Sequence, residues 1–399
     1  MTSMDPLDNL IKLIRCPSIT PSEGGALSVL SNILEPLGFS ITRITESESG
    51  IPDVENLYAR LGTQSPHLMF AGHTDVVPTG DEKEWKHPPF SATIENNKIY
   101  GRGAVDMKGA IACFAAAIAR FIKTNGHPKG SISFLITGDE EGLAINGTSK
   151  LLAWAAKKGE TWDACIVGEP TSNYKLGDTI KIGRRGSLSG FITIHGVQGH
   201  VAYQHLSDNP IHSILPILDS LIYPSFDTGN SNFLPTNLEI TTIDVGNPAL
   251  NVIPGKAHAA FNVRFNNLWT VSTLMKEIDT RINQAAQNML IKRNNTPINY
   301  TLKFNTSPSE AFLTYNNTLI PILKKTIENI TGINPELSTS GGTSDSRFIK
   351  DYCPVIEFGL VGKTMHMINE HADLFDLEIL TKIYENFIKN WFNCFSKRS

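Results

Sequence analysis

The sequence has few cysteines, and their arrangement suits neither covalent cross-linking nor thiolate chemistry. Five cysteines are scattered through 399 residues, at positions 16, 113, 165, 353 and 394. Their number is odd and no two form a Cys-x-x-Cys pair, so the sequence predicts neither a disulfide framework nor a cysteine metal site. Cys113 and Cys165 lie within apolar runs, where cysteine acts as a small core residue.

Long apolar runs and an excess of positive charge are also missing. No run of about 18 apolar residues occurs, so we expect no transmembrane helix. The formal net charge of −4 argues against nucleic acid or an anionic membrane as a partner. The N-terminus lacks the basic stretch and apolar core of a signal peptide, so we expect a cytoplasmic protein. The length allows two domains with a large core.

Strand and helix patterns alternate in the first 181 residues and return near the C-terminus. Thr20-Pro21-Ser22-Glu23 matches a capping box with proline at the first helical position, and it predicts a helix from about residue 21 to Leu37. The alternation predicts an α/β fold with a mixed, largely parallel sheet flanked by helices. Buried strands are expected at about 67–71, 131–137, 163–167 and 354–359, and helices at about 5–15, 106–125, 146–158, 317–331 and 377–391.

The pattern changes after Gly183. A strand, a helix, two strands, a helix and a strand follow, which is the split βαβ order of a ferredoxin-like α+β domain. We therefore expect residues 1–181 and 300–399 to form one domain and residues 182–299 to form an inserted one. The expected elements of the insertion are strands at about 188–195, 237–245, 257–265 and 298–304, and helices at about 211–221 and 270–288.

Short motifs rich in histidine and carboxylates follow the predicted strands of the α/β part. Singly each is weak, because a lone histidine after a strand is usually a hydrogen-bonded loop residue and a lone Asp-Glu-Glu is usually a solvated turn. In an open α/β sheet, however, such side chains gather beyond the carboxyl ends of the strands. Together they favour a site for a pair of Zn²⁺ or similar divalent ions. The motifs are Gly72–Pro78, Gly103–Gly109, Asp139–Gly142, Gly168–Pro170 and Met365–Glu370.

Charge balance supports two metal ions. Two divalent cations with one bridging hydroxide are neutralised by three ionised carboxylates, and buried charge is costly unless it is compensated. Asp75, two residues after His73, is placed to accept the second imidazole N–H of that histidine. Glu140 and Glu141 are adjacent, so one can bind metal while the other transfers a proton, and chemistry alone allows either assignment.

These motifs, with Gly183–Ser187, Gly196–Tyr203 and Ser340–Arg347, resemble those of the dinuclear zinc aminoacylase/carboxypeptidase metallohydrolases along essentially the whole chain. The resemblance implies an amide hydrolase with two Zn²⁺ per subunit, for which Co²⁺ or Mn²⁺ can substitute. It implies Glu140 as general base, Asp75 as the residue that orients His73, and His371 outside the metal site. Its implied ligands are His73 and Glu169 for one zinc, Glu141 and His366 for the other, and Asp106 between them.

The same resemblance assigns the inserted domain to a dimerisation lid. It implies a homodimer in which His200 donates to the carbonyl oxyanion in the other subunit. The implied substrate is a small anionic molecule with carboxylates at both ends, which fixed guanidinium groups bind well. Arg185 is a rival of Arg184 for this contact. The implied substrate-binding residues are Arg184, Tyr203, Asn251, Arg264, Thr343 and Arg347.

An inactive metal-binding or dimerising module is the alternative from a different class. Every implied metal position and the implied base are filled, which argues against that alternative.

Overall fold

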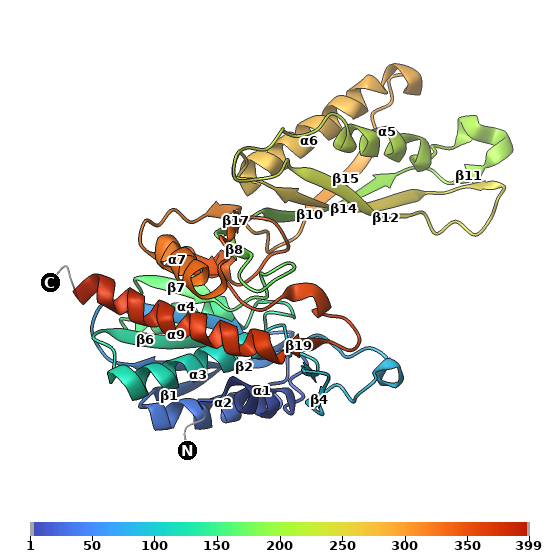
Figure 1. The fold of residues 1–399 in the computed structure, drawn as a ribbon. Coiled ribbons are helices and arrows are strands. Elements are labelled where there is room, and N and C mark those ends of the chain that lie inside the picture. Colours follow the sequence, from blue (N-terminus) through green and yellow to red (C-terminus); the bar gives the residue numbers. More distant parts are fainter. Residues whose placement is uncertain (1–3, 397–399) are drawn as a thin grey trace. The chain divides into compact units, whose positions relative to one another are not determined.

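The computed structural model describes residues 4–396, which divide into two compact units (Figure 1). Unit 1 holds the described residues of Met1–Ile182, Thr314–Ser338 and Ser344–Ser399, and unit 2 holds Gly183–Leu313 and Thr339–Thr343. Unit 2 runs beyond residue 299, where the sequence suggested a boundary, because β16 (Phe312–Leu313) pairs with β9 (Gly183–Arg184).

Unit 1 is built on an eight-stranded mixed sheet. Its central strands β6, β3, β7 and β18 are mutually parallel, while β1, β2 and β8 pair antiparallel with a neighbour. This arrangement confirms the predicted α/β fold with a largely parallel sheet. In spatial order the strands are β1 (Ser40–Glu48), β2 (Ile51–Leu61), β6 (Ser131–Thr137), β3 (His67–His73), β7 (Ala164–Val167), β18 (Val355–Glu357), β8 (Thr179–Lys181) and β17 (Glu336–Ser338).

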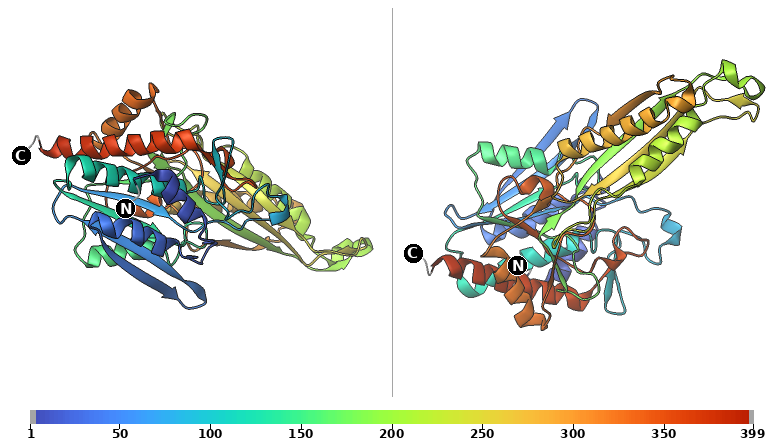
Figure 2. Two further views of the ribbon diagram at one scale, coloured as in Figure 1. Left: turned by 60° about the horizontal axis from the view of Figure 1, so that its bottom comes forward. Right: turned by 90° about the horizontal axis from the view of Figure 1, so that it is seen from above.

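The core of unit 1 forms around β3, whose seven residues are all buried. The Phe70 ring stacks on Phe114 of α3 (Lys108–Asn125) with centroids 4.2 Å apart, and both rings contact Tyr384 of α9 (Leu374–Ser396). Full burial of one such side chain stabilises the fold by about 1.5–3 kcal/mol. Helices α1 (Pro6–Ile14), α3 and α9 pack together (Figure 2), while α4 (Thr148–Lys157) packs on β2 and β6.

One predicted helix begins later than expected. Helix α2 spans Ala26–Leu34 and continues as a 3₁₀ turn, Glu35–Leu37, so the predicted start near residue 21 is wrong. The preceding segment pairs instead with the loop after β3, through a bridge between Ile19 and Val76. The N-cap residue is Gly25, and the Glu23 side chain accepts the backbone N–H of Leu27 in the first turn of the helix.

Unit 2 has the predicted β-α-β-β-α-β order. Its antiparallel sheet has the order β12-β14-β10-β15, and α5 and α6 pack over one face (Figure 1). The buried face joins Leu188 and Phe261 of the sheet with Ile214 and Ile278 of the helices. The elements are β10 (Gly186–His195), α5 (Pro210–Ile222), β12 (Asn237–Asp244), β14 (Lys256–Phe265), α6 (Val271–Asn288) and β15 (Asn299–Phe304).

Smaller elements complete the two units. Cys113 and Cys165 have no exposed surface, as expected of core residues. Among residues 4–396, every helix is too short or too polar to cross a bilayer. The remaining elements used below are β4 (Thr93–Glu95), β5 (Lys98–Tyr100) and β19 (His371–Asp373) in a three-stranded sheet, α7 (Leu319–Thr331) and α8 (Ser346–Ile349) in unit 1, and β11 (Gly199–His200) paired with β13 (Val252–Ile253) in unit 2.

Candidate metal centre

Three neighbouring parallel strands bring their following residues to one edge of the sheet. Strand β3 ends on His73, β6 ends just before the Asp139–Gly142 turn, and β7 ends just before Glu169. Because these strands run in the same direction side by side, their carboxyl ends meet. The loop before α3 adds Asp106, and the segment after β18 adds His366.

Asp106 lies between two imidazoles. Its Oδ1 is 3.1 Å from His73 Nε2, and its Oδ2 is 3.2 Å from His366 Nε2. Glu141 Oε1 is 2.7 Å from His366 Nε2, while Glu169 Oε1 is 3.8 Å from His73 Nε2. The five side chains therefore form two groups, around His73 and around His366, that share the Asp106 carboxylate.

The potential ligand atoms are close enough for metal binding. One oxygen or nitrogen atom from each of His73, Asp106 and Glu141 lies within 4.8 Å of the others, and the same holds for His73, Glu140 and Glu169. Glu140 is thus near the His73 half of the cluster, although the family resemblance assigns it a different role.

The carboxylates and imidazoles strongly perturb one another. Burial opposes ionisation of Asp106, but hydrogen bonds from His366 and His73 hold its pKa below the usual range. Hydrogen bonds to Asp106 and Glu141 raise the pKa of His366 to about 10. Burial raises the pKa of Glu169 well above its usual value, and the charges of Asp106 and Glu140 add to the shift. The cluster is therefore short of positive charge.

Two further observations fit divalent cations. Glu169 Oε1 is buried without a hydrogen-bond partner, although a buried carboxylate oxygen is costly unless it is paired. Within the described residues, no lysine or arginine forms an ion pair with Asp106, Glu140, Glu141 or Glu169. Nitrogen and oxygen donors of this kind suit Zn²⁺, and Co²⁺ or Mn²⁺ accept the same set.

Glycines before two of these residues leave space for Met107. A Cβ on Gly72 would lie 2.2 Å from Met107 Cε, and a Cβ on Gly168 would lie 2.7 Å from the same atom. Met107 is fully buried. Gly72 within β3 and Gly168 just after β7 therefore let the Asp106 loop cross the strand ends at close range.

Asp75 is differently placed from the sequence-based expectation. His73 Nδ1 lies 2.9 Å from the backbone carbonyl of Asp75 and 3.6 Å from its carboxylate. The Asp75 carboxylate instead accepts the backbone N–H groups of Glu140 and Glu141, at 3.3 and 3.0 Å. Burial raises the pKa of Asp75 to about 6. Asp75 thus links His73 to the turn that carries Glu140 and Glu141.

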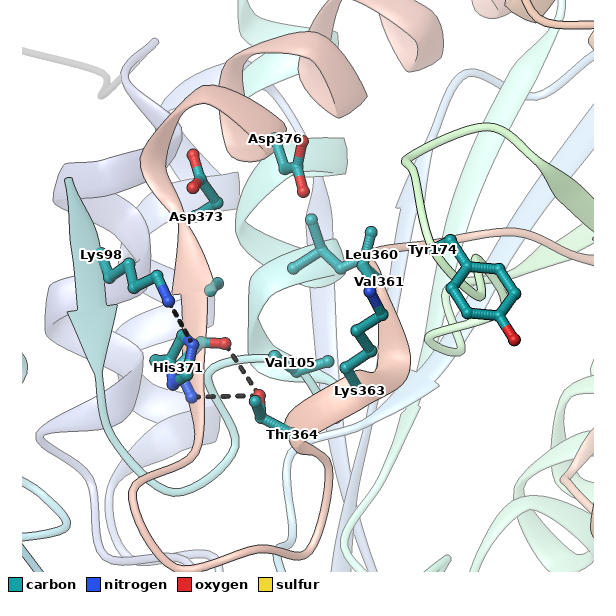
Figure 3. Close-up of a pocket in the computed structure, with 11 residues that line it drawn as sticks. Lys98, Val105, Tyr174, Leu360, Val361, Lys363, Thr364, His371, Asp373 and Asp376 are labelled. Atoms are coloured by element: carbon teal, nitrogen blue, oxygen red, sulfur yellow. Dashed lines mark hydrogen bonds between the residues drawn. The ribbon is translucent and has the colours of Figure 1, made fainter.

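The two histidines of the C-terminal motif lie in different surroundings. His366 joins the cluster with its backbone in the left-handed region, at φ 60°. His371 lies away from it, where Lys98 Nζ donates to its Nε2 at 3.0 Å and its Nδ1 bonds the Asn369 carbonyl. This ring lines a pocket of about 210 Å³. Figure 3 shows the lining residues, with Thr364 hydrogen-bonded to the His371 backbone.

Three of the remaining predicted residues gather at one end of unit 2. His200, in β11, is exposed and its Nδ1 accepts the Ala202 N–H. The Tyr203 ring lies 5.6 Å from the His200 ring, and the Asn251 carbonyl accepts the N–H of Val201. Both sides of the short β11–β13 pair therefore contribute to this group.

The predicted arginines occupy distinct surroundings. Arg184 Nη1 donates to the carbonyls of Ser340 and Gly342, next to Thr343 in unit 2, whereas Arg185 Nη1 donates to Asn237. In unit 2, Arg264 lies in β14 opposite Ser187 and Asn237. In unit 1, Arg347 lies in α8, with its guanidinium 4.7 Å from the Phe348 ring.

Two buried carboxylates near the cluster had no role in the sequence analysis. Asp345 Oδ2 accepts from Thr148 at 2.6 Å, and its charge helps to raise the pKa of Glu140, for which burial is the largest cause. Glu370 has no exposed surface and accepts hydrogen bonds from the Asp106 loop. Both lie in quoted motifs, so proximity to motif residues was the only available signal.

Comparison with solved structures shows the same fold. Aminopeptidase PepT from Bacillus cereus superposes with a TM-score of 0.77 at 19% identity, covering 98% of this chain and 100% of that chain. The M20 family metallo-carboxypeptidase Sso-CP2 from Sulfolobus solfataricus gives 0.76 at 18% identity, with 97% and 99% covered. A dinuclear metal-binding M20 peptidase from Bacillus subtilis gives 0.68 at 14% identity, with 96% and 97% covered.

A family model extends the likeness from the fold to the sequence. It is described as peptidase family M20/M25/M40 and matches residues 69–390, a range that includes His73, Asp106, Glu141, Glu169 and His366. The match covers most of the chain, and the chain therefore belongs to peptidase family M20/M25/M40.

Proposed function

We propose that the chain is a two-metal amide hydrolase. The observation that carries this proposal is Asp106, which presents one carboxylate oxygen to His73 and the other to His366. Glu169 would complete one metal position with His73, and Glu141 the other with His366. Bound divalent cations would polarise the amide carbonyl and lower the pKa of a water molecule.

Glu140 is the proton carrier in this proposal. Its carboxylate takes a proton from the attacking water as a C–O bond forms at the amide carbon. The proton then passes to the departing nitrogen as the C–N bond breaks. Burial raises the pKa of Glu140, which suits a group that must hold a proton between these two steps. Asp75 keeps Glu140 in place by accepting its backbone N–H.

Unit 2 supplies substrate contacts and the subunit interface in this proposal. His200 would donate to the carbonyl oxyanion of the partner subunit's substrate, with Tyr203 and Asn251 beside it. Mixing two inactive variants, E140Q and H200N, tests this role. If His200 acts across a homodimer, subunit exchange restores about one quarter of the wild-type activity, because one of two sites in each mixed dimer is intact. No recovery, with exchange verified, would contradict the trans role.

The substrate proposed is N-succinyl-LL-2,6-diaminopimelate, which would yield succinate and LL-2,6-diaminopimelate, a precursor of lysine and cell wall. Support comes from the resemblance of four stretches to succinyl-diaminopimelate desuccinylase rather than to acetylornithine deacetylase. Arg184, Arg264, Arg347 and Thr343 are the proposed contacts for the terminal carboxylates. The stretches are Asp139–Thr148, Gly183–Ser187, Gly196–Tyr203 and Ser340–Arg347.

Peptide hydrolysis or deacylation of another N-acyl amino acid is the second candidate. The structures with this fold include an aminopeptidase and a metallo-carboxypeptidase, which favours this candidate. Parallel assays on N-succinyl-LL-2,6-diaminopimelate, N-acetylornithine, dipeptides and tripeptides separate the two. We expect the highest kcat/KM on the succinyl substrate, and a higher value on any other would overturn the substrate proposal while leaving the hydrolase intact.

A further inference from the structure

The Glu370 carboxylate is the meeting point of two loops that carry candidate metal ligands. Its Oε1 accepts the backbone N–H groups of Val105 and Asp106, at 2.9 and 3.2 Å. Its Oε2 accepts the N–H of Gly103 at 3.0 Å and Arg102 Nη1 at 2.9 Å. All four partners are donors, so the carboxylate is bound in its ionised form.

Arg102 extends this contact to a third loop. The residue is 2% exposed, and its Nη1 also donates to the Met367 carbonyl while Nη2 donates to Pro78, at 3.2 and 3.3 Å. Pro78 lies in the segment that follows His73. The buried Arg102–Glu370 pair therefore joins the segments that carry His73, Asp106 and His366.

The segment around His366 requires such support. His366 and Asn369 both have left-handed backbones, at φ 60° and 63°, a conformation that costs about 1–3 kcal/mol in a non-glycine residue unless the surroundings impose it. Thr364 and His371 close the base of this segment (Figure 3), but the His366 side chain itself remains 48% exposed. Its position therefore depends on the backbone that Glu370 anchors.

We propose that Glu370 is a positioning residue that fixes Asp106 against His366, and that the metal position between these two residues loses affinity without it. The proposal rests on the proposed two-metal function. Loss of groups that orient metal ligands typically lowers metal affinity 10- to 100-fold. Because Asp106 also faces His73, the other metal position should weaken too. It should weaken less, since His366 is not one of its ligands.

The test is a Co²⁺ titration of the metal-free E370Q protein, followed by visible absorption and by competition with a chelator. Glutamine keeps the size of the side chain but places an NH₂ group against existing donors. We expect two equivalents in the wild type, and in E370Q a second equivalent that binds 10- to 100-fold more weakly with an altered spectrum.

The matched control is E378Q. Glu378 lies on α9 and forms another arginine–carboxylate pair, with Arg120, which this variant breaks. Its Co²⁺ binding should equal that of the wild type.

The double variant R102M/E370Q provides a second test in case E370Q misfolds, because it removes both members of the buried ion pair and leaves no unpaired charge. If E370Q unfolds, the double variant is titrated in its place, with the same expected loss. Unchanged affinity for both equivalents in a folded variant would overturn the positioning role. A wild type that binds no Co²⁺ would instead overturn the proposed function itself.

Discussion

The two ends of strand β3 each carry a buried histidine, yet the two imidazoles have opposite electrostatic surroundings. His67 is 2% exposed and His73 is 1% exposed. At the first end, Ser133 Oγ and the Thr161 carbonyl bond the His67 ring, and burial together with Arg60 lowers its pKa to about 3. At the other end, four carboxylates raise the pKa of His73 well above its usual value although burial opposes this.

This contrast shows how the sheet creates the site. Both rings are equally removed from water, so burial alone does not distinguish them. The difference comes from the chain direction, because parallel strands collect the Asp-Glu-Glu turn and Glu169 at the carboxyl end of β3 only. The same residue type is therefore a neutral core group at one end and a candidate metal ligand at the other.

Replacing each histidine by asparagine gives the largest expected difference. H73N should lower kcat/KM by more than about 10⁴-fold. That factor is the upper end of the range expected for loss of a general base. H67N should keep most of the activity and lose stability instead, because Ser133 and Thr161 lose a buried partner. Steady-state kinetics and thermal unfolding of the two variants measure both effects. Equal loss of activity in both would remove the distinction between the two ends.

Removing the proposed base tests the chemistry at the His73 end. E140Q should lower kcat by about 10²- to 10⁴-fold and leave the metal content unchanged. E160Q is the matched control at the His67 end, where Glu160 pairs with Arg60 at 3.1 Å, and it should leave kcat unchanged. A fall in bound metal in E140Q would show that Glu140 is a ligand rather than the base.

Removing the metal should make the free energy of unfolding depend on pH, through the site at the His73 end of β3. In the metal-free protein, the folded pKa of His366 is raised to about 10, so its proton stabilises the fold below pH 6.5 and is lost as pH rises toward 10. Unfolding free energy should therefore fall over this range. Metal at 100 times its dissociation constant should add about 2.7 kcal/mol and flatten the slope. Urea unfolding with and without Zn²⁺ checks this, and identical profiles would contradict it.

The His67 end should respond to acid in the opposite sense. The folded pKa of His67 is lowered to about 3, so the unfolded chain binds its proton first, and stability is lost as pH falls from 6.5 toward 3. At pH 5, the lowered pKa of His67 therefore reduces the free energy of unfolding by about 2 kcal/mol. The difference in unfolding free energy between wild type and H67Q at pH 7 and pH 5 isolates it. A difference that does not change with pH would mean that folding leaves the pKa of His67 unchanged.

Much of the fold around β3 could be predicted because local patterns and packing agree there. The uniformly apolar run before His73 indicated a central strand, and the split βαβ order of unit 2 was visible in its periodicity. The start of α2 failed for a long-range reason. Ile19 pairs with Val76 and Thr20 donates its backbone N–H to the Val76 carbonyl, so the chain makes a turn where Thr20 and Pro21 suggested a helix.

The candidate site was only partly accessible from sequence. Side chains that follow strands could be grouped, because parallel topology brings strand ends together. Hydrogen bonds from backbone N–H groups to a carboxylate could not be predicted, because they depend on the path of distant loops. Asp75 was expected to bond the His73 ring, yet its carboxylate receives the N–H groups of the Glu140–Glu141 turn. Glu370 likewise acts on backbone more than 260 residues earlier in the chain.

The most direct test of the account is anomalous diffraction from crystals of active, metal-loaded protein, measured at the absorption edge of the bound metal. We predict two peaks, one on each side of the Asp106 carboxylate, the first beside His73 and Glu169 and the second beside Glu141 and His366. Fully active protein with no peak at Asp106, or with metal bound only elsewhere, would contradict the two-metal site.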